Sequence, residues 1–285
     1  MNPRRARPLL GTLVEITLSE LAPRSDAGCA FEAAFGAAER VHRLMSAHDA
    51  ASDVSRINRA HPGQAVAVDP WTHRVLEVAL EVARITRGLF DPCVAPLLQQ
   101  AGLLPDFADK PALPWGDYRA LQLLGDNSVR KLAPLQLTLD GIAKGFAVDR
   151  ATEALQAAGV AAGAVNAGGD LRVFGREAQP IHLRHPSCPG RFSFIGRVRD
   201  AAIATSGGCL SRKAVAGQEL PHIFDPRAKR AFTDTRSASV LSRECVLADA
   251  LAKTVLLDAA RARHALARYR ARAFVFEGDA MRRAA

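Results

Sequence analysis

Apolar and polar residues alternate from Leu10 to Leu18, and this period of two predicts a first β-strand. In residues 27–46 and 71–87 the apolar residues instead recur every three to four positions, which predicts two amphipathic helices, the second ended by Gly88. Further helices are predicted at residues 143–158, 245–257 and 260–269. Further strands are predicted at residues 120–124, 135–140, 163–174, 192–205, 237–242 and 272–276.

The predicted helices and strands are mixed without strict alternation, which is typical of an α+β fold or an irregular α/β sandwich. The chain has no repeat of fixed period and no low-complexity linker, so we expect a single domain over residues 1–285. Residues 103–118 are rich in proline and polar residues. We expect this segment to form an excursion over the surface.

The composition is that of a globular protein. Hydrophobic residues make up 48% of the chain, and there is no run of about 18 apolar residues that would span a membrane. The five cysteines are scattered without Cys-x-x-Cys spacing, which argues against a disulfide framework and a zinc site and suits a reducing compartment. The start of the chain lacks the pattern of a signal segment, so we expect a cytoplasmic protein, or a periplasmic one if a signal segment has been trimmed.

A net charge of +9 raises the question of nucleic-acid binding. The arginines are dispersed along amphipathic segments, aromatic residues are only 6% of the chain, and no nucleic-acid motif is present. We therefore expect no nucleic-acid partner. A basic surface still favours anionic ligands such as nucleotides.

The helix predicted around residues 244–258 carries two charges on a largely apolar surface. Asp249 and Lys253 are four residues apart and therefore share one stripe of the helix. A buried carboxylate must be paired, hydrogen-bonded or bound to a metal. The simplest interpretation is an i, i+4 ion pair, which on a surface contributes a few tenths of a kcal/mol.

Two glycine-containing segments could approach a phosphate. In TLDGIAKGFAVD (138–149) a strand ends in a glycine turn, and Lys144 and Gly145 begin a helix, whose free N–H groups and positive dipole end attract anions. In VNAGGDLRVFG (165–175), Gly168, Gly169 and Asp170 would let the backbone come close to a ligand. A plain strand-turn-helix and an ordinary turn explain the same two segments.

Two further segments carry hydroxyl, imidazole and carboxylate groups. In AIATSGG (202–208), Thr205, Ser206 and the following N–H groups could line an anion nest, although a tight hairpin also explains these residues. In PHIFDP (221–226), His222 and Asp225 share a short loop. A histidine near a carboxylate is a candidate acid or base in a phosphate-binding protein, whereas a lone loop histidine is usually only solvated.

Taken in order, these motifs resemble those of the FAD:protein FMN transferase (ApbE) family over nearly the whole chain. The resemblance also includes Leu10-Gly11-Thr12 and the stretch MSAHDAASDVSRIN at residues 45–58. Several short motifs in register are far more specific than any one of them. Those that carry the resemblance further along are Gly88-Leu89-Phe90-Asp91 with Pro96-Leu97, GIAKGFAVD, VNAGGD, AIATSG, HIFDP, SASV (237–240) and ADAL (248–251).

The resemblance implies an ApbE-like (T-fold-like) mixed sheet and helix architecture that binds FAD. It implies transfer of FMN from FAD to a Ser or Thr hydroxyl of a target protein, with release of AMP. An FAD pyrophosphatase that gives FMN and AMP, or a non-catalytic FAD-binding protein, are the alternatives. The residues that the resemblance assigns to FAD are Met45, Phe90, Asp91, Lys144, Gly145, Gly168, Gly169, Asp170, Thr205, Ser206 and Gly207. Those assigned to catalysis are His222, Asp225, Asp249 and Lys253.

The resemblance also implies a Mg²⁺ held by Asp249, by the backbone carbonyl of Gly141 and by a Thr four residues after the Asp. In this chain that last position is Lys253, and a charged ammonium cannot ligate a hard cation. Thr254 lies about 100° further round the helix, so it does not simply replace the missing ligand.

Two other departures lie nearby. Thr138 stands where the family usually has Asp, Asp140 stands where it has the first Gly, and His48 stands where it commonly has Tyr. A carboxylate has thus moved two residues along one strand face while an ammonium has entered the metal position. Our hypothesis is that Lys253, paired with Asp249 or Asp140, does part of the cation's electrostatic work. In the alternative hypothesis the metal site is lost and the protein only holds flavin.

Overall fold

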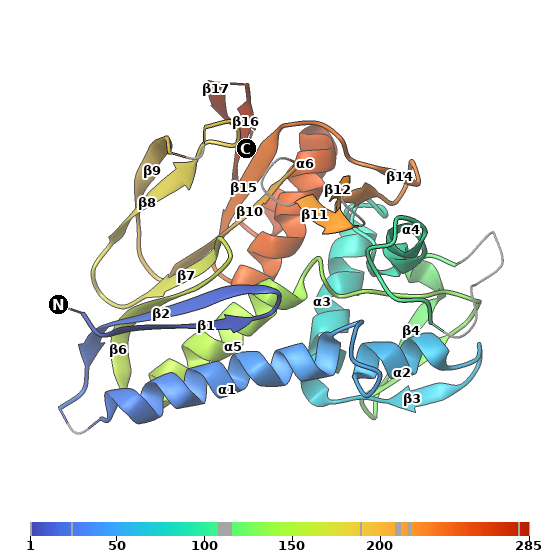
Figure 1. Ribbon diagram of the computed structural model, residues 1–285, viewed down its shortest axis with the longest axis horizontal. Coiled ribbons are helices and arrows are strands. Elements are labelled where there is room, and N and C mark those ends of the chain that lie inside the picture. Colours follow the sequence, from blue (N-terminus) through green and yellow to red (C-terminus); the bar gives the residue numbers. More distant parts are fainter. Residues whose placement is uncertain are drawn as a thin grey trace.

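The structure is a computed structural model that describes residues 2–23, 25–107, 116–188, 190–208, 212–215, 218–278 and 280–284. Its largest element is an eight-stranded antiparallel sheet with the order β1-β2-β6-β7-β10-β15-β16-β17 (Figure 1). In that order the strands are Arg4–Leu9, Thr12–Leu21, Val160–Ala167, Asp170–Phe174, Ala201–Gly207, Ser237–Ser242, Arg272–Glu277 and Ala280–Arg283.

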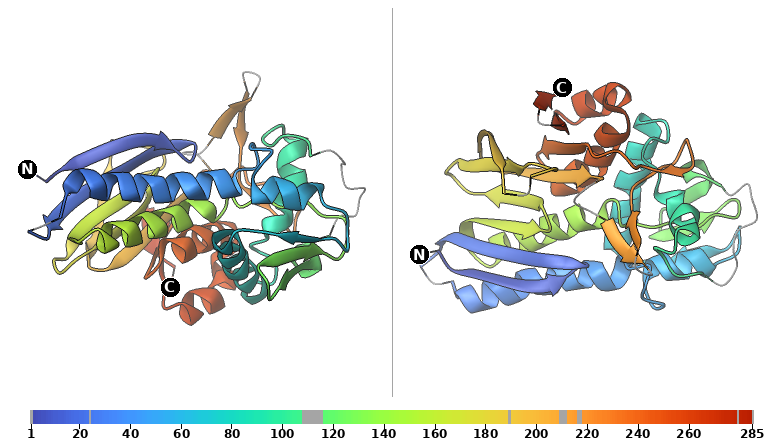
Figure 2. Two further views of the ribbon diagram at one scale, coloured as in Figure 1. Left: turned by 90° about the horizontal axis from the view of Figure 1, so that it is seen from below. Right: turned by 45° about the horizontal axis from the view of Figure 1, so that its top comes forward.

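Three long helices cover one face of this sheet. They are α1 (Ala27–Met45), α5 (Ala143–Ala157) and α6 (Cys245–Arg268), with α5 lying between the other two (Figure 2). Along β2 the side chains of Val14, Ile16 and Leu18 are buried while the residues between them are more exposed, as the alternating sequence predicts. The predicted first strand and the predicted first helix are therefore confirmed.

A second group of elements lies at one end of the sheet, on the right in Figure 1. It contains the helices α2 (Asp53–Arg59), α3 (Pro70–Ile85) and α4 (Ala95–Gln100) and the short turns η1 (Pro92–Val94) and η2 (Tyr118–Ala120). A three-stranded sheet with the order β3-β5-β4 joins them (Ala65–Ala67, Ser128–Lys131 and Leu121–Leu124). The smaller hairpins are β8–β9 (Gln179–Arg184, Phe192–Val198), β11–β12 (Arg212–Val215, Gln218–Pro221) and β13–β14 (Phe224–Asp225, Arg230–Ala231).

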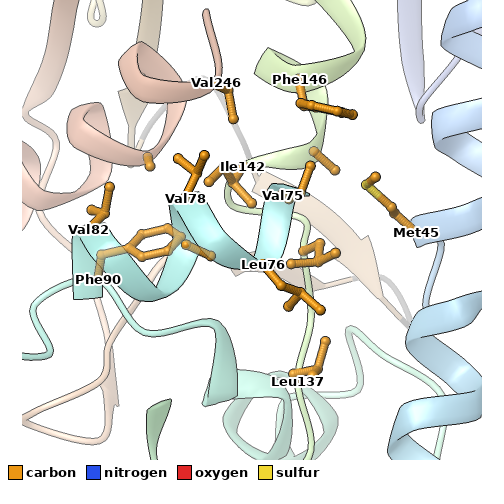
Figure 3. Close-up of a cluster of buried hydrophobic side chains, with 14 of the residues drawn as sticks. Met45, Val75, Leu76, Val78, Val82, Phe90, Leu137, Ile142, Phe146 and Val246 are labelled. Atoms are coloured by element: carbon orange, nitrogen blue, oxygen red, sulfur yellow. The ribbon is translucent and has the colours of Figure 1, made fainter. Parts of the chain in front are cut away.

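Both groups of elements share one apolar core. Figure 3 shows its centre, where valine and leucine side chains of α3 face apolar side chains of α5, α6 and α1. The ring of Phe90 points into this cluster and is only 6% exposed. Labelled members of the core are Met45, Val75, Leu76, Val78, Val82, Phe90, Leu137, Ile142, Phe146 and Val246. The motif segments around Phe90, Ile142 and Leu251 enter this core, so its packing fixes their relative positions. The VNAGGD and AIATSG segments instead contribute Val165 and Ala202 to a neighbouring apolar cluster.

Two segments that were predicted as single strands each contain two strands. The segment 163–174 is the hairpin of β6 and β7, joined at Gly168 and Gly169, whose φ angles of 60° and 99° favour glycine. The ordinary turn considered for this glycine pair is thus confirmed. The segment 192–205 contains β9, which pairs with β8, and part of β10, which belongs to the large sheet, with Asp200 in the left-handed region (φ 45°) between them. Both predictions of one continuous strand were wrong.

The predicted strand 135–140 was also wrong. This segment is buried and extended, but it is held outside the sheets by side-chain hydrogen bonds. The Asn58 amide donates to the Leu137 carbonyl at 2.8 Å and accepts from the Leu137 N–H at 2.8 Å. An asparagine thus satisfies the backbone groups that a neighbouring strand would otherwise pair.

The two predicted C-terminal helices, 245–257 and 260–269, are confirmed as the two parts of α6. Asp258, whose φ and ψ of −156° and 94° are not helical, separates them at the predicted gap. The expected surface excursion at 103–118 is wrong at its start, because Leu103, Leu104 and Phe107 are buried in the core. Residues 108–115 of that excursion lie outside the described residues.

The described residues bear on two expectations from the composition, which concern membrane spans and cysteines. None of their helices is long and apolar enough to cross a membrane. Four of the cysteines, Cys29, Cys93, Cys188 and Cys245, are free thiols. Cys209 lies outside the described residues.

Candidate active site

A cavity of about 470 Å³ collects most of the predicted site residues. It lies where the end of α1, the segment after α3, the turn before α5, the β6–β7 turn, the end of β10, the loop before β13 and helix α6 come together. The predicted residues that line it are Met45, Phe90, Asp91, Gly141, Lys144, Gly168, Thr205, Ser206, His222 and Lys253. Thr138, Asp140 and His48, the positions at which the sequence departs from the family, line it as well.

Asp249 lies behind this wall and is only 1% exposed. The Gly145 N–H donates to Asp249 Oδ2 at 3.0 Å, so the carboxylate is bound directly to the turn that begins α5. The Lys253 ammonium donates to Asp249 Oδ1 and also to the Asp249 backbone carbonyl, at 3.2 Å. The buried carboxylate therefore has both a backbone partner and a cationic partner, as burial requires.

A second lysine approaches the same carboxylate. The Lys144 ammonium forms an ion pair with Asp170 and lies 3.8 Å from Asp249 Oδ2. Asp170 is also only 1% exposed. Asp170, Lys144, Asp249 and Lys253 thus form one chain of alternating charges, which we call the charged quartet.

The charged quartet is layered. The lysine side chains are 32% exposed at Lys144 and 18% at Lys253, whereas both aspartate side chains are 1% exposed. Both lysines line the cavity, so a ligand there meets the ammonium groups before the carboxylates. Nearby charges dominate because the Coulomb energy falls with distance. The quartet therefore presents positive charge to the cavity although it is neutral as a whole.

The protonation of the quartet follows from these contacts. Burial alone would raise the pKa of Asp249, but Lys144 and Lys253 outweigh it and the pKa is lowered. Burial and the Asp249 charge raise the pKa of Asp170, which the lysines only partly oppose. Burial would lower the pKa of Lys144, but Asp170 and Asp249 raise it instead. Lys144 therefore stays charged at neutral pH.

The glycine at position 145 lets α5 and α6 approach closely. A Cβ atom there would lie 2.3 Å from the Cys245 carbonyl oxygen and 2.8 Å from the Asp249 Cβ. These distances are shorter than any ordinary contact, so a side chain would push the two helices apart. The small residue in the Lys144-Gly145 pair is thus what brings Asp249 within hydrogen-bonding distance of the turn.

The motifs in the sequence did not point to Asp149, a residue that positions the start of α6. The Asp149 carboxylate, 2% exposed, accepts from the Cys245 N–H at 3.0 Å and the Val246 N–H at 2.9 Å, which caps the start of α6. It also pairs with Arg172 of β7. The usual signal is a capping residue just before a helix, but this cap comes from α5, far away in the sequence.

Gly141 packs against Lys253. A Cβ atom at Gly141 would lie 3.3 Å from the Phe90 ring and 3.4 Å from the Lys253 Cδ. The stem of Lys253 therefore lies close to the turn whose carbonyl was expected to hold a metal. Beside it, Thr138 and Asp140 line the same cavity, but none of the described strands carries them, so the strand face that they were expected to share is not formed.

Three predicted site residues take part in hydrogen bonds of backbone N–H groups. The Asp91 carboxylate accepts from the Cys93 N–H at 2.8 Å and from the Tyr118 N–H at 3.2 Å. Burial raises its pKa to about 6. The Asp225 carboxylate accepts from the Arg227 N–H at 2.9 Å and the Ala228 N–H at 3.0 Å, and closes the β13–β14 turn. Gly169 donates its N–H to the Asn166 side chain at 3.0 Å.

The hydroxyl and imidazole groups come from β10 and from the loop before β13. Thr205 Oγ1 and Ser239 Oγ share a hydrogen bond of 2.7 Å across β10 and β15, while Ser206 lines the cavity beside them. His222 lines the cavity together with Ile223, Phe224 and Pro226. The imidazole and the charged quartet therefore border the same space.

Comparisons with known proteins agree with this geometry. A family model described as the ApbE family matches residues 10–276. An FAD:protein FMN transferase of Vibrio cholerae is 29% identical over 235 residues, which are 77% of this chain and 70% of that protein. An FAD:protein FMN transferase of Rhodobacter capsulatus is 30% identical over 260 residues, which are 86% of this chain. The match covers only 49% of that relative, so this chain spans about half of its length. The crystal structure of an ApbE protein from Thermotoga maritima superposes with a TM-score of 0.87 at 26% identity, covering 99% of this chain and 97% of that one.

Proposed function

The chain belongs to the ApbE family, and from that premise we propose that it is an FAD:protein FMN transferase. The observation that supports this proposal is the buried carboxylate of Asp249, which accepts a hydrogen bond from the Gly145 N–H. Two lysine ammonium groups lie between this carboxylate and the cavity. Such a wall suits a diphosphate, because lysines act as point charges toward phosphate oxygens.

The reaction exchanges one phosphoester oxygen for another. The hydroxyl oxygen of a Ser or Thr in the target protein forms a bond to the phosphorus of the FMN half. The bond from that phosphorus to the bridging oxygen breaks, and the bridging oxygen leaves with AMP and the bonding electron pair. The hydroxyl proton passes to a base. Catalysis of such a transfer is chiefly positioning and charge stabilisation.

We place the diphosphate of FAD against Lys144 and Lys253, near the backbone of Gly168. The flavin ring would rest on the apolar side chains of Met45 and Phe90, which line the same cavity. His48 lies on this wall and is exposed. An imidazole offers less stacking surface than the phenol ring that the family commonly has there.

We propose His222 as the group that accepts the hydroxyl proton, since it borders the same cavity as the two lysines. Asp225 would act as a positioning residue. Its carboxylate holds the turn that follows His222 through the Arg227 and Ala228 N–H groups. This differs from the direct role expected from the sequence.

The donor set does not fit the Mg²⁺ that the resemblance implies. Mg²⁺ requires oxygen ligands in octahedral geometry, but both Asp249 oxygens already accept from donors, and the Lys253 side chain stands beside Gly141 where the family has a hydroxyl ligand. Among the described residues no group of three His, Cys, Asp or Glu side chains could hold a metal ion. No step of the proposed reaction therefore uses a metal held by Asp249.

The test is incubation with FAD and a candidate target protein that bears a flavinylation Ser or Thr. Mass spectrometry of the target should show one added FMN, and chromatography should show AMP in equal amount. Free FMN without a modified target would mean a pyrophosphatase. Bound FAD that stays intact would mean a flavin-binding protein, and either result would contradict the proposed function.

A further inference from the structure

We propose that the Lys253 ammonium occupies the place of a divalent cation, so that the protein binds the diphosphate of FAD and transfers FMN without Mg²⁺. This inference rests on the proposed function. It assigns Lys253 to contact with the phosphate oxygens and makes Asp249 the residue that positions this lysine. The sequence left Asp249 and Asp140 open as its partner; the structure pairs Lys253 with Asp249.

The ammonium is held in one place. Lys253 Nζ has three N–H donors, and Asp249 accepts from it through both Oδ1 and the backbone carbonyl. Since Lys253 lines the cavity, the remaining donor is available to a ligand on that side. A lysine on a flexible stem ordinarily loses side-chain entropy when it binds, but here the protein has already restrained it.

The burial pattern favours a binding role over a simple helix ion pair. An i, i+4 pair on a surface would expose both partners, whereas here the acid is 1% exposed and the base faces a cavity. The Gly145 N–H and the Lys144 ammonium approach the other Asp249 oxygen. The carboxylate thus orients two cations toward the same space.

Thr254 does not supply a replacement ligand. Its hydroxyl donates to the Leu251 carbonyl at 2.8 Å within α6, and its side chain is fully buried. The hydroxyl is therefore bound within its own helix. An exposed carboxylate, Asp140, shares the cavity, but it is part of the turn beneath FAD rather than of the quartet.

The first experiment measures FAD binding without turnover, by quenching of flavin fluorescence, in EDTA and in excess Mg²⁺. We expect the two affinities of the unaltered protein to agree within about twofold. Lys253→Met should weaken binding by about 10- to 100-fold in both buffers, the range for losing a hydrogen bond to a charged group. Lys253→Arg should retain most of the affinity because it keeps the charge.

Lys253→Thr gives the sharper test. Removing the ammonium frees Asp249 and restores the family's hydroxyl ligand, so FAD binding should become weak in EDTA and recover when Mg²⁺ is added. Arg261→Met is the matched control, because it removes an exposed cation of α6 that pairs with Asp258 outside the cavity. It should change neither affinity. Circular dichroism melts would verify that each variant is folded.

Two results would overturn the inference: FAD binding or FMN transfer by the unaltered protein that is lost in EDTA and restored by Mg²⁺, or Lys253→Met that binds FAD as tightly as the unaltered protein. Both leave the proposed function intact. Failure of the proposed function is a different result, namely no transfer to any target in either buffer although FAD binds.

Discussion

The Lys253 ammonium donates to both the side chain and the backbone carbonyl of Asp249, one helical turn earlier in α6. The pair is not an ordinary surface ion pair, because Asp249 is also bound by the Gly145 N–H and lies 3.8 Å from the Lys144 ammonium. The start of α5 and the N-terminal part of α6 are thus joined through a single carboxylate. Changes at that carboxylate should affect stability and ligand binding together.

Replacing Asp249 with asparagine should therefore do more than remove a helix ion pair. The amide keeps the shape of the side chain but leaves Lys253 without its counter-charge and Lys144 with Asp170 alone. We expect a loss of about 1–3 kcal/mol in the free energy of unfolding, less than for a fully buried pair because both lysines are partly exposed. FAD affinity should fall at least about tenfold. Urea unfolding and flavin fluorescence measure the two effects.

Glu77→Gln is the control for that change. Glu77 pairs with Arg74 on the exposed side of α3, at 3.0 Å, so its loss should cost at most about 0.5 kcal/mol and leave FAD binding unchanged. If Asp249→Asn had an equally small effect on both quantities, Asp249 would be only a helix ion-pair partner.

The features that could be predicted from sequence are the local ones. The period of β2, the amphipathic helix α1 and the order of the short motifs are all written in adjacent residues, and they indicate the α+β fold and most of the cavity lining. The cap on α6 could not be found this way, because Asp149 and Cys245 come together only when α5 packs on α6. The hydrogen bonds between Asn58 and Leu137 are equally non-local.

The partner of Lys253 shows the same limit. Both Asp249 and Asp140 were compatible with the sequence, because helix spacing favours the first and the apparent exchange of residues favours the second. Only the burial of Asp249 beneath the lysine distinguishes them. The prediction of one continuous strand across Gly168-Gly169 failed for a different reason, because the strands on either side of this turn are equally apolar.

Gly145→Ala should separate the two helices that carry the quartet. The added methyl group would meet the Cys245 carbonyl oxygen at 2.3 Å. We expect a loss of about 1–3 kcal/mol in stability, as for overpacking of a core, together with weaker FAD binding. Gly36→Ala, at an open position of α1, should instead stabilise the protein by about 0.5–1 kcal/mol. Thermal unfolding of both variants would contradict this interpretation if the two shifts had the same sign.

Thr254→Val distinguishes the role of Thr254 from that of its neighbour Lys253 in α6. The valine keeps the shape of the threonine and loses only the hydroxyl that donates to Leu251 at 2.8 Å. We expect FAD affinity to remain within about twofold of the unaltered protein, with a stability change of about 1 kcal/mol or less. A titration with FAD in Mg²⁺ decides the matter, since a loss of binding that depends on the metal would make Thr254 a ligand.

The last prediction concerns pH. Burial raises the pKa of Asp91 to about 6, above the value of about 3.9 for an unfolded chain. The folded state therefore binds this proton more tightly. The associated stability is fully present below about pH 4 and is lost as the pH rises to about 6, by at most about 3 kcal/mol. Asp91→Asn lacks this titration, but it loses one of two backbone hydrogen bonds, worth about 1 kcal/mol.

The Asp91→Asn variant should consequently be less stable than the unaltered protein at pH 4 and more stable at pH 7. Asp117 gives the opposite case, because a hydrogen bond from Arg119 lowers its pKa. Its contribution is present at neutral pH and is lost as the pH falls, so Asp117→Asn should be relatively more harmful at pH 7 than at low pH. Thermal unfolding tests the pair, between pH 4 and 7 for Asp91→Asn and from pH 7 to below about pH 3.9, the pKa of an unfolded aspartate, for Asp117→Asn. A stability difference for Asp91→Asn that does not change between pH 4 and 7 would show that folding does not raise the pKa of Asp91.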